Sequence, residues 1–140
     1  MQRYLKKEEF THYQGTRLTA EWFYTASLKI PGLDYYFGLN QQDRVRLDQI
    51  IKYICDASPG TIFPLSLYRI EDRENKIYAL KRRDERFFNF TTEGSKIIIT
   101  NAYHKHSQQM TKADLEHLKV AATYRKDYLI RVKQGVYYEN

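Results

Sequence analysis

The sequence has few of the residues that cross-link a chain or interrupt its folding. Its 140 residues contain one cysteine, three prolines and six glycines. Because Cys55 has no second cysteine to pair with, an intrachain disulfide and a cysteine-based zinc site are excluded, as is usual in a reducing cytosol. The low proline and glycine content excludes collagen-like and long disordered segments. We therefore predict one cytoplasmic domain over residues 1–140, in which residues 1–16 form a candidate N-terminal extension.

Long apolar runs are also missing. No stretch approaches the roughly 18 apolar residues that cross a membrane, and the charged positions 6–9 stand where a signal peptide needs its apolar segment. We therefore expect no membrane association. The chain also lacks a Walker or dinucleotide-binding glycine loop and a serine in the G-x-S-x-G context. These absences exclude the common nucleotide-binding and serine-hydrolase motifs.

Positive charge is concentrated in the second half of the chain. Lysine and arginine outnumber aspartate and glutamate by 23 to 17, which gives a formal net charge of +6. Thirteen of these cations but only six of the acids lie between Lys76 and Lys133, so this stretch carries the whole excess. Aromatic residues among the cations suit phosphates and stacked bases, although a solvated charged face over core aromatics has the same composition. The charge favours an anionic partner without identifying it.

The first half of the chain predicts two helices. Residues 17–28 offer apolar side chains for packing and are followed by Pro31-Gly32, which favours a helix that stops there. The second helix has stronger signals, because Asn40 is a good N-cap and apolar residues over 47–54 follow the i, i+3, i+4, i+7 pattern up to Pro59-Gly60. We expect the two helices to form an antiparallel pair on one face of a sheet.

The second half predicts strands followed by a helix. The strands are expected over residues 62–68, 75–80, 86–90 and 96–102, separated by the charged residues 81–85 and by a turn at 93–95. Thr111 and Asp114 fit the start of a helix whose inward stripe would be Leu115, Leu118, Ala122 and Tyr128. The predicted fold class is α+β: an N-terminal helix pair on a curved antiparallel sheet of about four strands, with a C-terminal helix.

The densest set of titratable side chains follows the last predicted strand, at Tyr103, His104, Lys105 and His106. If the backbone stays extended, His104 and His106 share one face and Lys105 lies on the other. Histidine titrates near neutral pH, so such residues can move protons. A solvated loop without a shared task is the plain alternative.

A metal site is not favoured at this motif. His-x-His offers two ligands, but no carboxylate lies within the motif, no cysteine pair exists, and Lys105 repels a cation. We therefore expect neither a metal nor a cofactor.

Cations with tyrosine and histidine meet the needs of metal-independent RNA cleavage. The RNA 2′-hydroxyl attacks the adjacent phosphate while a base and an acid transfer protons and cations stabilise the added charge. In this hypothesis Arg86 or Lys81 binds the phosphate. His104 exchanges a proton, and Lys105 or Tyr103 assists. The other RNA-binding candidates come from the same basic stretch: Arg82, Arg83, His106, Lys112, Lys119 and Arg125.

Several segments of the second half also stand in a familiar order. They are Lys76-Ile77-Tyr78-Ala79-Leu80-Lys81, Arg86-Phe87-Phe88, Lys96-Ile97-Ile98-Ile99, Tyr103-His104-Lys105 and a helix with Ala122 and Arg125. This combination resembles the RelE/HigB-like toxins of the RelE/ParE superfamily, notably the phage Gp49-like branch. The likeness spans about residues 40–131, and the predicted helix pair extends it to about Arg17.

The resemblance implies the toxin of a bacterial or phage toxin–antitoxin pair, with a cognate antitoxin as partner and mRNA on the ribosome as substrate, cleaved without a metal. It matches Lys81 to the basic residue that closes the second core strand, and Arg86 to the arginine that contacts the scissile phosphate. Tyr103 and His104 resemble a Tyr-His pair of some HigB members. Ile77 and Ala79 depart from the pattern, because RelE carries catalytic lysines there, so activity must rely on other groups.

Two other functions stay open at this point. A ParE-like protein acts on a topoisomerase and cleaves no RNA, and a non-enzymatic basic module or inactive toxin only binds nucleic acid or protein. Fold does not choose between them. The nuclease hypothesis predicts that Arg86, His104 and Lys105 converge on one concave surface, and it fails if they point to opposite faces.

Overall fold

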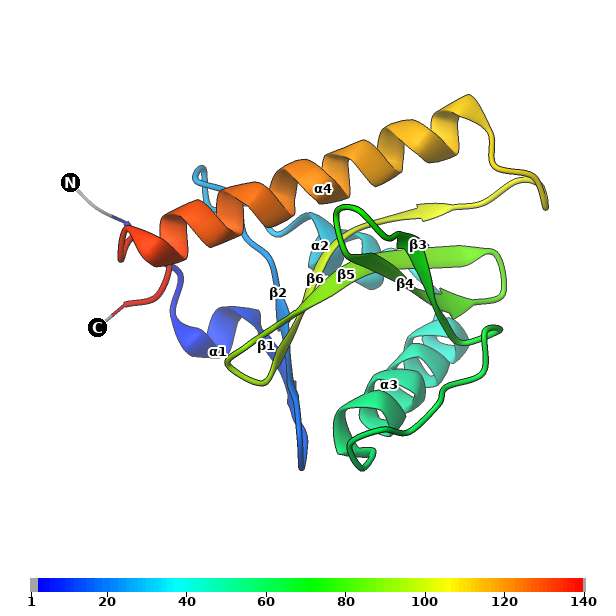
Figure 1. Cartoon of the computed structure of the whole chain (residues 1–140), viewed down its shortest axis with the longest axis horizontal. Coiled ribbons are helices and arrows are strands. Elements are labelled where there is room, and N and C mark those ends of the chain that lie inside the picture. The colour runs from blue at the N-terminus through cyan, green and yellow to red at the C-terminus, as the bar shows by residue number, and fades with distance from the viewer. Residues whose placement is uncertain (1–2, 140) are drawn as a thin grey trace.

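Six strands form one mixed sheet through the middle of the molecule (Figure 1). The computed structural model describes residues 3–139. Its strands are β1 (Thr11–Gln14), β2 (Thr19–Trp22), β3 (Tyr68–Asp72), β4 (Ile77–Arg82), β5 (Glu85–Thr92) and β6 (Lys96–His104), in the spatial order β1-β2-β6-β5-β4-β3. Only β2 and β6 pair in parallel among these strands. The α+β class is confirmed, whereas the expected sheet of about four antiparallel strands is too small and lacks the parallel pair.

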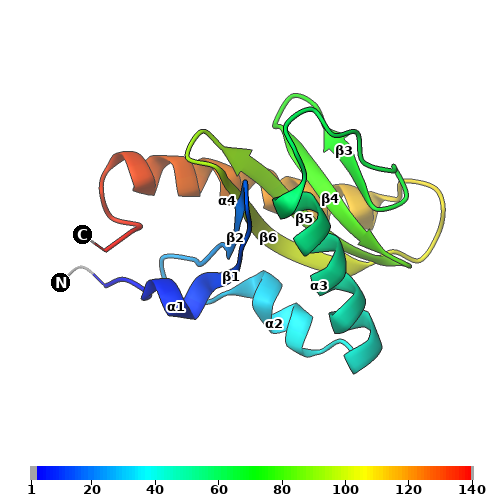
Figure 2. The same ribbon diagram turned by 90° about the horizontal axis from the view of Figure 1, so that it is seen from below.

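Helices cover both faces of this sheet (Figure 2). The one-turn helix α1 (Lys7–Phe10) and the helices α2 (Pro31–Phe37) and α3 (Gln41–Asp56) lie on one side, which we call the α3 face. The long helix α4 (Lys112–Lys133) crosses the other side, the α4 face. No helix among residues 3–139 is long and apolar enough to span a membrane.

The helix expected over residues 17–28 is wrong, because this segment enters the sheet as β2. Trp22, Phe23 and Tyr24 are consecutive and all at most 1% exposed. A surface helix buries one stripe and cannot bury three successive side chains, whereas a strand between two neighbours and two helical layers can. Pro31 begins α2 instead of stopping a helix, since its fixed φ and missing N–H suit the first helical position.

The second expected helix is confirmed as α3. The Asn40 side chain accepts a hydrogen bond of 2.8 Å from the backbone N–H of Asp43, so it caps the helix as predicted. The predicted stripe of Leu47, Ile50, Ile51 and Ile54 is buried. This stripe lies on the side of α3 that packs against β4, β1 and β2.

The strand expected over residues 62–68 is also wrong, because β3 begins only at Tyr68. Ile62 is 92% exposed and Leu65 is 70% exposed, so no strand or helix covers these two apolar side chains. Pro64 has no N–H to give to a strand ladder. The three later strands occur close to their expected positions, and a two-residue turn with Arg83 at a φ of 52° joins β4 to β5.

The C-terminal helix begins as predicted. Thr111 and Asp114 form a reciprocal capping box, in which each side chain accepts from the other's backbone N–H. Leu118 and Tyr128 face the sheet, but Leu115 is 46% exposed and Ala122 only half-buried, so half of the expected inward stripe is wrong.

Candidate functional site

A hollow of about 240 Å³ opens on the α4 face of the sheet. Its walls come from four neighbouring strands and from the loop between β6 and α4. We call it the basic hollow, and it is lined by Arg69, Glu71, Lys81, Arg86, Phe88, Tyr103, Lys105, Gln108 and Met110. Four cations against a single acid make it an attractive place for an anion.

Strand register brings these side chains to one face. Lys81 of β4 lies directly opposite Arg86 of β5, and Arg86 lies directly opposite Tyr103 of β6. Directly opposed residues project from the same face of a sheet, so the three side chains form a row across three strands. Lys105 follows Tyr103 by two residues and returns to the same face.

The hydrogen bonds of the hollow orient its cations without neutralising them all. Lys105 Nζ donates to Asp114 Oδ2 at 2.8 Å, and Arg69 Nε lies 3.4 Å from Glu71 Oε1. Lys81 Nζ donates to the Leu65 carbonyl at 3.2 Å, and Arg86 donates to the carbonyls of the β4–β5 turn. Within residues 3–139, no carboxylate lies at ion-pair distance from Lys81 or Arg86. Their positive charge is therefore available to a ligand.

Two residues of the hollow have shifted acidities. Burial, together with the neighbouring charges of Arg86 and Arg69, lowers the pKa of Lys81. Burial and the nearby Asp114 carboxylate raise the pKa of Tyr103 to about 12. The Lys81 ammonium is therefore a stronger acid than that of an exposed lysine, while Tyr103 keeps its proton at neutral pH and can act as a hydrogen-bond donor.

The pair of Lys105 and Asp114 predicts a loss of stability in acid. Burial opposes ionisation of Asp114, but hydrogen bonds from Lys105 and Thr111 outweigh it and lower the pKa of the carboxyl to about 2. Because the folded pKa lies below the unfolded value of about 3.9, this contribution is complete above roughly pH 5 and disappears as the pH falls toward about 2. Urea unfolding of the protein and of Asp114→Asn should therefore differ at about pH 6 and converge in acid. A difference that does not change with pH would contradict this assignment.

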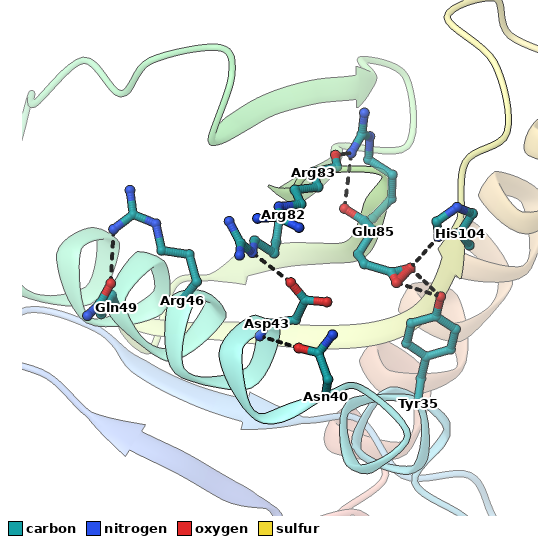
Figure 3. Close-up of polar contacts among 10 residues, drawn as sticks. Tyr35, Asn40, Asp43, Arg46, Gln49, Arg82, Arg83, Glu85 and His104 are labelled. Carbon is teal, nitrogen blue, oxygen red and sulfur yellow. Dashed lines mark hydrogen bonds and ion pairs between the residues drawn. The ribbon is translucent and has the colours of Figure 1, made fainter.

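His104 does not join the hollow. Its side chain lies on the α3 face, where Nδ1 is 3.0 Å from Glu85 Oε1, and Tyr35 donates to the same oxygen at 2.6 Å (Figure 3). Side chains alternate along β6, so Tyr103 and His104 must point to opposite faces. His104 and His106 do lie together, with ring centroids 5.0 Å apart. The expectation that His104 converges with Arg86 and Lys105 is wrong, so the cleavage mechanism predicted from the sequence, in which His104 exchanges the proton, fails.

Arg82 and Arg83 lie outside the hollow as well. Arg82 Nε is 2.9 Å from Asp43 Oδ1, an ion pair that ties the end of β4 to the first turn of α3 (Figure 3). Both arginines line a separate groove of about 560 Å³ between the β4–β5 turn and α3, whose other wall carries Arg46 and Gln49. Arg82 and Arg83 therefore lie on the α3 face.

The last three predicted cations lie along α4. Lys112 and Lys119 are exposed, and Lys119 pairs with Glu116 at 3.4 Å. Arg125 is half-buried, with its guanidinium carbon 5.8 Å from the centre of the Phe90 ring. Of the eleven predicted site residues, the hollow thus unites Lys81, Arg86, Tyr103 and Lys105.

Sequence reasoning missed Arg69 and Glu71, which form the β3 wall of the hollow. The only signal for them is the alternation of charged and apolar residues over 68–72, and it was hidden by the apolar segment just before it. Gln108 and Met110 come from an irregular loop and carry no pattern that points to a site.

No ready metal centre accompanies this site. Among residues 3–139, no three His, Cys, Asp or Glu side chains are grouped so that they could hold a metal ion. Comparison of the chain with models of protein families and with curated proteins gives no match.

Proposed function

We propose that this chain is a RelE/HigB-like toxin that cleaves mRNA on the ribosome without a metal, and that the basic hollow receives the scissile phosphate. The observation that carries the proposal is the row of Lys81, Arg86 and Tyr103 across three strands, with Lys105 beside it. A phosphodiester needs cations that are held in place but not neutralised by carboxylates. Lys81 and Arg86 meet both conditions.

The reaction we assign to the hollow begins with the RNA 2′-hydroxyl. Its oxygen attacks the adjacent phosphorus as water accepts the hydroxyl proton, and the bond from phosphorus to the 5′-oxygen breaks. The leaving 5′-oxygen takes a proton from the Lys81 ammonium, so the products are a 2′,3′-cyclic phosphate and a 5′-hydroxyl. We assign this proton transfer to Lys81 because it lies directly opposite Arg86 in the row and because its lowered pKa makes the ammonium a stronger acid.

The other groups stabilise the charge that develops on the phosphate. Arg86 has a planar guanidinium suited to two phosphate oxygens, and its bonds to the turn carbonyls fix its direction before the substrate arrives. Lys105 adds a second cation, held by Asp114. Preorganised donors of this kind each contribute about 100- to 1,000-fold to a rate.

A toxin of this kind needs restraint in its own host, so the proposal includes a cognate antitoxin as a partner. The positive charge of the hollow favours an acidic segment over it.

A second candidate is a member of the same fold that binds RNA without cleaving it. Two observations favour it: His104 lies on the wrong face, and Ile77 and Ala79, which stand where RelE has lysines, are fully buried. In this case the hollow holds a phosphate, but no proton is transferred.

The two candidates separate in a translating bacterial extract to which the purified protein is added. The toxin proposal predicts new mRNA 5′ ends at codon positions set by the ribosome, and their loss with Lys81→Ala. Intact mRNA, together with RNA binding that depends on Arg86, would favour the binding module. Intact mRNA without RNA binding would contradict both.

His104→Ala provides a sharp test of the residue assignment. We expect this variant to keep mRNA cleavage within about threefold of the unchanged protein, since its side chain faces away from the hollow; loss of a true general acid or base costs about 100- to 10,000-fold. Lys81→Ala, measured in parallel, should show the large loss. A large loss in His104→Ala with an unchanged melting curve would place the chemistry on the α3 face.

A further inference from the structure

The outer side of α4 carries a seven-residue repeat that the proposed cleavage does not use. A lysine stands at every seventh position. Three positions after each of the first three lysines stands an apolar residue, either leucine or alanine. The repeat, which we call the α4 seam, consists of Lys112, Leu115, Lys119, Ala122, Lys126, Leu129 and Lys133. Residues seven apart in a helix lie nearly above one another, so these side chains form one continuous stripe of roughly 31 Å.

This stripe faces solvent instead of the sheet. The four lysines are exposed, with the Lys119 side chain 75% accessible. Leu115 is 46% exposed and Leu129 is 42% exposed. Alternating spacings of three and four residues are those by which one helix packs against another. Here the seam has no helix against it within the described chain.

The seam also borders a groove. A space of about 520 Å³ lies between α4 and the β3–β4 turn, lined by Leu115, Leu118, Lys119, Ala122, Thr123 and Lys126 with Asp72 and Asn75 opposite. Its floor is apolar and lysines stand along it. The Asp72 carboxylate is engaged by the backbone and side chain of Asn75. The groove therefore offers apolar contact next to unbalanced positive charge.

The positive charge along the seam favours an acidic partner. Glu116 pairs with Lys119, and Asp127 pairs with Arg131. For Lys112, Lys126 and Lys133, no ion pair occurs with any residue among 3–139. Lysine at each repeat disfavours packing against a second copy of the same helix. In one register lysines would face lysines, and in the other lysines would face leucines.

Nucleic acid fits the seam less well than a helix does. A phosphate backbone makes no use of exposed Leu115 and Leu129, and no aromatic side chain is part of the seam to stack on a base. Acidic side chains at the same seven-residue interval would meet every lysine, with apolar residues against Leu115 and Leu129. We propose that the α4 seam is the docking site for an acidic amphipathic helix of another protein, and this proposal holds whether or not the basic hollow cleaves RNA.

The test uses a labelled synthetic helix of about three heptads, with glutamate and leucine at the two seam positions of each heptad. Fluorescence anisotropy should show that this peptide binds the protein saturably. A peptide of the same composition in scrambled order should not bind. Lys119→Glu combined with Lys126→Glu should weaken binding by about tenfold or more. The same double variant should bind a peptide in which lysine replaces only the two glutamates that face positions 119 and 126. Lys7→Glu combined with Arg46→Glu, two exposed reversals on α1 and α3, should leave binding unchanged.

Each other outcome overturns the proposal. Failure of the peptide to bind the unchanged protein removes the docking site, and equal binding by the α4 double variant moves it elsewhere. Binding of an RNA oligonucleotide that the double variant loses, without peptide binding, would make the seam a nucleic-acid surface. A concentration-dependent dimer in sedimentation, lost in the double variant, would assign the seam to a second copy of this chain. Circular dichroism melts confirm that each variant is folded.

Discussion

Arg86→Ala should lower mRNA cleavage by about 100- to 1,000-fold while the protein stays folded. Arg86 stands between Lys81 and Tyr103 in the row that crosses the hollow, and its guanidinium is aimed by carbonyls of the β4–β5 turn. Alanine removes the donors that meet the phosphate as its charge grows. The side chain is only half-buried, so stability should change little. Cleavage in a translating extract and a thermal melt of the same preparation provide the two measurements.

Two further variants make the Arg86 result specific. Arg86→Lys keeps the charge but loses the planar fork, and it should recover only part of the activity. Arg73→Ala removes an exposed arginine of the β3–β4 turn outside the hollow and should cleave normally. If Arg73→Ala and Arg86→Ala lose activity equally, general charge rather than the hollow drives the reaction.

Tyr137→Ala should lower the free energy of unfolding by about 3 to 5 kcal/mol, the range for removing a large buried aromatic. Tyr137 is 1% exposed, and its ring stacks on Tyr24 with centroids 4.4 Å apart. Its hydroxyl accepts from the Tyr24 backbone N–H at 3.1 Å, and the Arg131 guanidinium carbon lies 4.7 Å from its ring centre. The substitution thus opens a cavity where the C-terminal segment meets β2 and α4. Urea unfolding measures the loss.

Tyr137→Phe separates packing from hydrogen bonding. It keeps the ring but leaves the Tyr24 N–H without its partner, a cost of about 1 to 3 kcal/mol. Phe37→Ala is the matched control, because Phe37 is 64% exposed and should cost little. A loss below about 0.5 kcal/mol in Tyr137→Ala would show that the C-terminal segment does not belong to the core in solution.

The parts of the fold that sequence predicts are those whose local signals agree with their surroundings. Asn40 and Thr111 each offer a side-chain cap, and α3 and α4 begin at these caps. The segment around Trp22 could not be predicted this way, because its burial on both faces depends on β6 and on helices far away in the sequence. Ile62 shows the opposite error, since high strand propensity does not form a strand where nothing covers it.

The site residues also divide into those that local sequence signals predict and those that they do not. The β4–β5 turn sets the register that pairs Lys81 with Arg86, so these two residues were predictable as neighbours. A β-bulge between the pairs of Phe87 and Asn89 shifts the β5–β6 register by one residue, so the position of Tyr103 opposite Arg86 could not be counted from the turn at 93–95. Arg69 depends on the position of β3, which the exposed segment before it obscured. His104 follows Tyr103 directly in the sequence but lies on the opposite face, because side chains alternate along β6. The sequence itself shows this alternation.

The chemistry of the new RNA ends tests the central claim most directly. After reaction in a translating extract, the 5′ ends of mRNA are mapped with and without prior phosphorylation by a kinase, for the unchanged protein and for Lys81→Ala. Attack by the 2′-hydroxyl predicts ends that carry a 5′-hydroxyl, appear only after kinase treatment and vanish in the variant. Ends that already carry a 5′-phosphate, or equal cleavage by Lys81→Ala, would contradict the assignment of metal-independent RNA cleavage to the basic hollow.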